Sequence, residues 1–143
     1  FGAGMIDPLE AVVQYLRRAA DINVLTAGQV AAKHKFGDGW AIPSKAITLR
    51  GNGGSVDLYT ERQLLRLDAR TYGENQWEAG RVYRALVAVT RSATRVKAET
   101  TDGNALIYWL VPRSPPSQLY DRELKMDYIL VFLEAAVAEV AVP

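Results

Sequence analysis

Apolar residues near the start of the chain recur at the spacing of a helix. A good helix start precedes them: the Asp7 side chain can cap free N–H groups, and Pro8 lacks an N–H that would need a partner. The apolar positions, three or four residues apart, are Leu9, Val12, Val13 and Leu16. The pattern predicts an amphipathic helix over residues 8–20 and a connector over 21–29.

A second helical pattern follows Gly73. Asn75 is a candidate N-cap, Glu78 lies in the first turn and Arg91 lies near the end, as the helix dipole favours. The apolar stripe comprises Ala79, Val82, Leu86 and Val89. We expect a helix over residues 75–91. Because Trp77, and Trp109 further along the chain, lie inside periodic segments, we expect both in the core.

Between these helices the period changes to two, which is typical of a strand. One set of alternating residues is small or apolar: Leu65, Leu67, Ala69 and Thr71. The other set is charged or polar: Arg66, Asp68, Arg70 and Tyr72. Residues 56–72 are therefore predicted to form a strand, or a bent pair of strands, whose charged face either contacts solvent or meets another subunit. Gly73 would allow the sharp turn from sheet to helix.

The remaining chain contains further strands and turns. Strands are predicted over 45–51 and, more weakly, over 29–36, and Asp102-Gly103 marks a hairpin. "GNGGS" at 51–55 reads as a turn, and loops are expected over 37–44 and 112–123. The last stretch begins as a strand, and its alanine-rich end fits either strand or helix. These elements predict an α+β protein of one domain, with two helices packed on one face of a mainly antiparallel or mixed sheet.

Composition narrows the function classes. Seventeen basic and sixteen acidic residues give a net charge of +1, which does not indicate a dedicated nucleic-acid binder. The absence of cysteine excludes disulfides and thiolate metal sites. The most hydrophobic stretch is interrupted by Glu134 and Glu139, and is too short to span a bilayer. We expect residues 1–4 to be foreign to the native chain, so that the domain covers 5–143 from Met5.

No motif for catalysis, a cofactor or a metal is present. The glycines in "RGNGGSV" lack the Lys-Ser/Thr that follows a phosphate-cradling loop, and Glu74 would repel a phosphate from the helix start after Gly73. His34, the only histidine, has no partner identifiable in the sequence. We therefore predict no catalytic, cofactor-binding or metal-binding residues and no cofactor.

Several short motifs together resemble the tail terminator and tail-completion proteins of long-tailed bacteriophages. The resemblance covers most of residues 5–133: a first helix opening "DPLEAVV", a charged strand ending "LDARTYG", and a helix that begins "WEAGRVYRAL". The positions that match are Asp7, Pro8, Ala11, Tyr72, Gly73 and Ala79. The loop 112–123 and the alanine-rich end depart from the family pattern.

This resemblance implies a structural virion protein without catalytic activity. Members form a ring, usually a hexamer, which caps the head-proximal end of the tail tube, ends its polymerisation and offers a surface for head joining. The implied partners are other copies of the chain, the tail tube protein and a head connector or head-completion protein. DNA would only pass through the lumen, and no membrane is involved. The implied location is the neck of the virion, after assembly in the host cytoplasm.

Candidate contact residues are aromatic and charged residues on loops and on the charged strand face, because interfaces favour aromatics and arginines and because mixed charges fix the register of a contact. They are Phe36, Trp40, Arg66, Asp68, Arg70, Arg113, Tyr120 and Arg122. Trp40 equally fits a residue that covers the core beneath its own loop. Two alternatives remain open: a neighbouring neck or head-completion adaptor, and a small ligand-binding domain or enzyme with a site built from scattered carboxylates.

Overall fold

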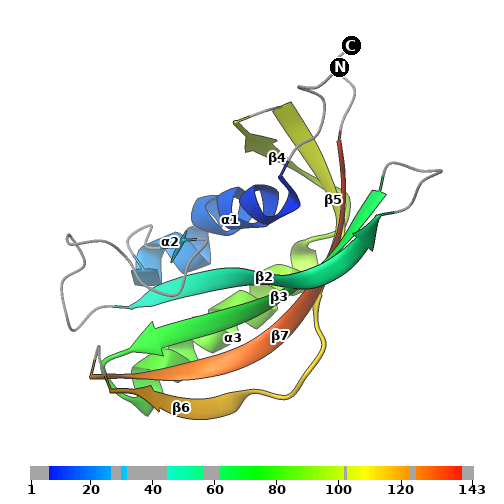
Figure 1. Ribbon diagram of the computed structural model, residues 1–143. Helices are drawn as coiled ribbons and strands as arrows, with labels where there is room; N and C mark the ends of the chain where they lie inside the picture. The colour runs from blue at the N-terminus through cyan, green and yellow to red at the C-terminus, as the bar shows by residue number, and fades with distance from the viewer. Residues whose placement is uncertain are drawn as a thin grey trace.

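The fold is a sheet with helices on one face, as the sequence predicts (Figure 1). The computed structural model describes residues 7–26, 30–31, 45–56, 62–101, 103–122 and 125–139. Within these ranges there are three helices and seven strands. All strand pairs are antiparallel except the short parallel pair of β1 (Val30–Ala31) with β2 (Ala46–Val56). The α+β class and the mainly antiparallel, mixed sheet are therefore confirmed.

The first predicted helix is present but shorter. Helix α1 spans Pro8–Arg18, and the Asp7 carboxylate accepts a hydrogen bond from the Leu9 N–H at 2.9 Å. The chain turns at Ala19, which has extended backbone angles, and a second helix α2 follows over Ala20–Thr26. The prediction of a connector over 21–29 was wrong for residues 21–26, because Ile22 is buried in the core and holds about two further turns of helix.

Helix α3 spans Gln76–Ser92, close to the predicted 75–91. Asn75 is its N-cap and accepts a hydrogen bond from the Glu78 N–H at 3.0 Å. The predicted apolar stripe is buried, but the prediction that Trp77 lies in the core was wrong: its side chain is 82% exposed. Trp77 precedes the buried Ala79 by two residues, which turns it about 200° away on the helix.

The sheet is ordered β1-β2-β3-β7-β5-β4, and β6 also pairs with β7. Its strands are β1 (Val30–Ala31), β2 (Ala46–Val56), β3 (Arg62–Gly73), β4 (Val96–Thr100), β5 (Gly103–Pro112), β6 (Ser117–Asp121) and β7 (Met126–Glu139). The β4–β5 hairpin is confirmed, although Gly103 pairs with Thr100 as the first residue of β5 and is not a turn residue. The alanine-rich end, left open by the sequence, continues as strand to Glu139 because it pairs with β3 on one side and β5 on the other.

Two segments expected to be irregular contain strand. The glycine-rich 51–55 is part of β2, with a register irregularity between Gly51 and Gly54 where Gly53 has φ 89°. The loop predicted over 112–123 contains β6. Strand β5 ends at Pro112 and β6 begins at Ser117, and both strands pair with β7. In the connection between them, the Arg113 N–H still donates a hydrogen bond to the Phe132 carbonyl of β7. An open edge of β7 supplies the hydrogen-bond partners that make β6 a strand.

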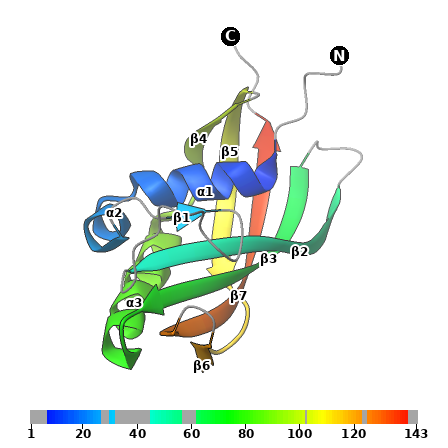
Figure 2. The same cartoon turned by 60° about the vertical axis from the view of Figure 1, so that its left-hand side comes forward.

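The two faces of the sheet differ in character. Alternate residues of the central strands β3 and β7, such as Leu67 and Val131, meet α1 and α3 in one apolar core. Figure 2 shows α1 crossing the strands and α3 lying lengthwise beside them. The intervening residues, such as Arg66 and Glu134, lie on the opposite face, which carries no helix in the described part of the chain. This helix-free face holds four of the eight candidate residues, namely Arg66, Asp68, Arg70 and Arg113.

Candidate assembly surface

The helix-free face of the sheet carries a row of charges along β3, as the alternation predicted. Arg66, Asp68 and Arg70 lie opposite Glu134, Phe132 and Leu130 of β7 in the strand register. Arg113, which follows β5, joins them from the far side of β7. We call these residues, together with Arg50 and Asn52 of β2, the charged face: Arg50, Asn52, Arg66, Asp68, Arg70, Arg113, Phe132 and Glu134.

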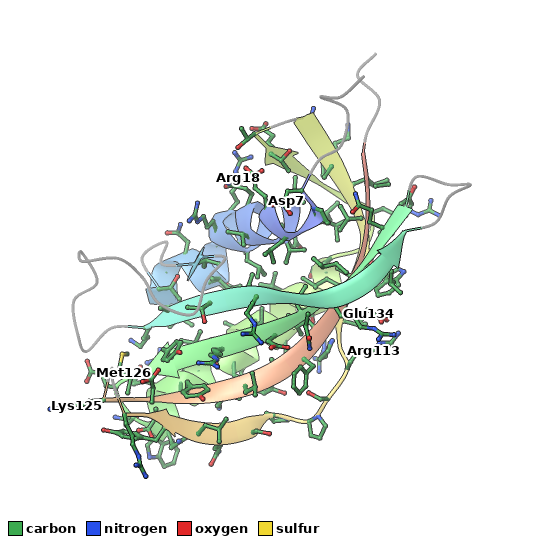
Figure 3. All side chains as sticks on the ribbon, viewed as in Figure 1. Asp7, Arg18, Arg113, Lys125, Met126 and Glu134 are labelled. Carbon is green, nitrogen blue, oxygen red and sulfur yellow. The ribbon has the colours of Figure 1, made fainter. Side chains whose placement is uncertain are left out.

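Glu134 is the centre of the charged face. Its carboxylate accepts hydrogen bonds from Arg113 Nε at 2.9 Å and from Arg66 Nε at 3.4 Å. The hydrogen bonds from Arg113, followed by the nearby positive charges, lower the pKa of the Glu134 carboxyl despite its burial. Figure 3 shows Arg113 and Glu134 close together beside β7. The carboxylate is nearly buried, whereas both guanidinium groups reach solvent.

Asp68 is held in a similar way. Its carboxylate accepts a hydrogen bond from Asn52 Nδ2 at 3.1 Å and forms an ion pair with Arg50 Nη2 at 3.6 Å. The Asp68 residue is only 8% exposed, while the Arg50 side chain is largely exposed. The face therefore buries its carboxylates and presents its arginines, which makes its outer layer positively charged.

Arg70 contacts two tyrosine side chains. Its guanidinium stands 5.0 Å above the ring centre of Tyr128 and donates a hydrogen bond to the Tyr72 hydroxyl at 3.4 Å. Tyr72 is fully buried with Ala46 and Met126, and burial raises the pKa of its hydroxyl group. Arg70 is thus fixed by its neighbours and only partly accessible.

An open hollow of about 460 Å³ lies in the middle of the charged face. Arg66, Arg113, Glu134, Asn52 and Phe132 contribute to its lining. Phe132 is 41% exposed, so the hollow combines an apolar side chain with paired charges. A mixture of exposed aromatic and arginine side chains is typical of protein interfaces, and the carboxylate in this hollow is already neutralised by the arginines.

Not all candidate residues share this face. Arg66, Asp68, Arg70 and Arg113 are brought together, whereas Tyr120 of β6 and the following Arg122 lie at the other end of the sheet. Phe36 and Trp40 lie outside the described residues, as does His34. Trp109 is partly buried rather than fully so.

Glu134 was missed as a site residue. Its only signal in the sequence is a carboxylate inside an otherwise apolar stretch.

The described residues contain no group of three or more His, Cys, Asp or Glu side chains placed to hold a metal ion. In the same part of the chain, no helix is both long and apolar enough to cross a membrane. The two carboxylates of the charged face, Glu134 and Asp68, are engaged by arginine or asparagine side chains and not by each other. Chemically, this face can form ion pairs and hydrogen bonds with a partner surface.

Comparison with known proteins gives a likeness of fold. No family model matches the sequence, and no curated protein matches it. Sixteen chains of solved structures match the fold. One of them belongs to the virion of a native gene transfer agent particle. The likeness to that chain has a TM-score of 0.60 and 16% sequence identity, and it covers 91% of this chain and 93% of that one. The two chains share a fold.

Proposed function

We propose that this protein is a structural component of a phage-like particle, in which it closes the head-proximal end of a tail tube as a ring. In this role it ends polymerisation of the tube and provides the surface for head joining. The ring, most simply a hexamer, lies in the neck of the virion after assembly in the host cytoplasm. No reaction, cofactor or metal is part of the proposal.

The observation that carries the proposal is the shared fold with a chain of a gene transfer agent virion. The likeness spans nearly the whole of both chains, so it concerns the complete arrangement of sheet and helices. The tail position itself rests on the sequence resemblance to tail terminators, through residues such as Asp7, Pro8 and Gly73. Two independent comparisons thus lead to the same class of particle.

The surface of the protein supports an assembly role. The charged face offers exposed arginines whose carboxylate partners are buried, so a partner protein can meet fixed charges in one register. Such pairs contribute little to stability at an exposed surface, typically below about 1 kcal/mol each. At an interface they select the partner and its orientation.

A neighbouring neck or head-completion adaptor is the second candidate. It would use the same fold and the same charged face, but it would bind a head connector and not the tube. A small ligand-binding protein or enzyme is the third. The open hollow at Arg66, Arg113 and Glu134 is the feature that favours it, because hollows with a few convergent polar groups are where small ligands bind.

Mass in solution separates these candidates. The purified protein would be measured by native mass spectrometry alone, with the tail tube protein of the same particle, and with the head connector. A ring that forms alone or on the tube end supports the terminator. Binding to the connector but not to the tube supports the adaptor. A monomer that ignores both proteins contradicts both roles, and leaves the small-ligand candidate.

A further inference from the structure

A second surface, distinct from the charged face, lies between the start of α3 and strand β6. It is an open groove of about 660 Å³. Its lining comprises Gln76, Trp77, Gly80, Tyr83, Arg84, Pro116, Gln118 and Ile129. Arg84 is the only charged residue among them. Its Nη1 atom lies just 3.2 Å from where a side chain at Gly80 would begin, so the glycine leaves room for the arginine.

Trp77 gives this groove a large aromatic side chain that is exposed to solvent. Its side chain is 82% exposed, and Tyr120 on the neighbouring β6 is 56% exposed. Tyr120 and Gln118 lie on the same side of β6, because alternate residues of a strand share a face. Tryptophan, tyrosine and arginine are the residues that most often dominate the binding energy of protein interfaces. A largely exposed tryptophan that lines the same groove as an arginine therefore indicates a contact surface.

The same chain carries a complementary feature on α2. Val24 is 83% exposed, the most exposed of its large apolar side chains in the described ranges. Asp21 precedes it by three residues, so both lie on one side of the helix. Neither Asp21 nor Arg84 forms an ion pair with another described residue. Val24 and Asp21 therefore complement the groove: the apolar side chain can pack against Trp77, and the carboxylate can pair with Arg84.

The two features lie toward opposite ends of α3. The groove is built on the first turns of the helix, from Gln76 to Arg84, whereas Asp21 borders a hollow with Ala88, Val89 and Ser92 near the other end. At 1.5 Å per residue, Trp77 and Val89 are separated along the helix by about 18 Å. Within one chain the carboxylate and the groove are therefore apart. Between two copies arranged head to tail they can meet.

We infer that the groove binds α2 of a second copy of this chain, with Val24 of that copy against Trp77 and its Asp21 paired with Arg84. A contact between two different patches is heterologous, and repetition of such a contact closes a ring when the rotation permits. The inference deepens the proposed ring and rests on it: it names the surfaces through which neighbouring subunits meet. The charged face then remains available for the tube or the head.

A charge exchange tests the pairing. Arg84→Glu and Asp21→Arg each place like charges at the contact, and each is expected to weaken ring formation roughly tenfold or more, the effect of about 1.4 kcal/mol. The double variant restores opposite charges and should recover most of the lost assembly. Trp77→Ala should weaken the ring to a similar degree. Ring formation is measured by native mass spectrometry over a concentration series, with the tube protein present.

Controls keep the outcomes distinct. Arg91→Glu makes the same charge change on an exposed part of α3 away from the groove, and should leave the ring unchanged. Circular dichroism and urea unfolding verify that each variant folds. If the single variants assemble as the wild type does, the inferred contact is wrong, although the protein still forms a ring. The same holds if the double variant does not recover ring formation. If the wild type itself forms no ring, the proposed function fails first.

Discussion

Gly73 lies at the end of β3, shortly before α3 begins. The structure allows the loss of folding stability on replacing this glycine to be worked out. Its φ is not positive: the positive-φ glycines among the described residues are Gly53 and Gly103. The constraint on Gly73 is close contact instead. A Cβ at this position would lie 2.3 Å from the Ala79 backbone nitrogen and 2.7 Å from the carbonyl carbon of Glu78. Nonbonded heavy atoms settle at about 3.5 Å, so the helix start would have to shift by about 1 Å.

The surroundings of Gly73 resist such a shift. The Ala79 N–H donates to the Asn75 carbonyl at 3.0 Å in the first turn of α3, and Gly73 itself pairs with Asp127 of β7. Overpacking in a close-packed region costs about 1–3 kcal/mol. Because the obstructing atoms belong to backbone that cannot rotate away, we expect Gly73→Ala to cost about 3 kcal/mol, near the upper end of that range. For a chain of this length the melting temperature should fall by about 10 °C.

Urea unfolding followed by circular dichroism measures this cost, with two matched glycine variants beside it. Gly51→Ala has no atom within 4 Å of the new carbon and no positive φ, so it should change the free energy of unfolding by less than about 0.5 kcal/mol. Gly53 also has no atom within 4 Å of the new carbon, but its φ is +89°, which a residue with a side chain rarely adopts. Gly53→Ala should therefore lower the free energy of unfolding by about 1 kcal/mol through backbone conformation alone. A Gly73→Ala protein as stable as the wild type would refute the close approach of helix and strand.

Three further substitutions test other parts of the structure. Because the pKa of Glu134 is lowered from its usual 4.5, its pairing with the arginines stabilises the fold above that pH and is lost as pH falls through the lowered value. Glu134→Gln should therefore be least stable relative to wild type at neutral pH, with a gap in unfolding free energy that narrows towards pH 3; a constant gap would contradict the pairing. Asn75→Ala should cost about 1 kcal/mol in urea unfolding through the lost cap on Glu78, while Asn75→Asp should not. Ser114→Ala removes the hydroxyl that accepts from the Phe132 N–H at 3.0 Å, and faster hydrogen exchange at that amide should follow, with no change elsewhere in β7.

Local patterns predicted the helices well. Asp7 and Asn75 mark the starts of α1 and α3, and the buried stripes of both helices follow the apolar spacing. Capping and amphipathic spacing depend on residues within a few positions of one another, so the sequence displays them directly. The prediction for Trp77 was wrong because a place inside a periodic segment does not fix the side of the helix on which a residue lies.

Strand boundaries were predicted less well for a different reason. The segment "GNGGS" in β2 and the segment after Pro116 in β6 have weak strand propensity. They become strand because β3 and β7 present backbone groups that need partners. A partner strand far away in the chain supplies this information, and neighbouring residues do not.

Local periodicity and capping were enough to predict the class of fold, the two long helices, the hairpin and the charged side of β3. Which charges meet depends on contacts between distant segments. Arg66, Arg113 and Glu134 are up to 68 positions apart, and the β3–β7 and β5–β7 pairings bring them together. Likewise, only the packing of α3 beside β6 turns Trp77 and Arg84 into one groove. Contacts between distant segments depend on strand register and helix packing, which a chain acquires when it folds.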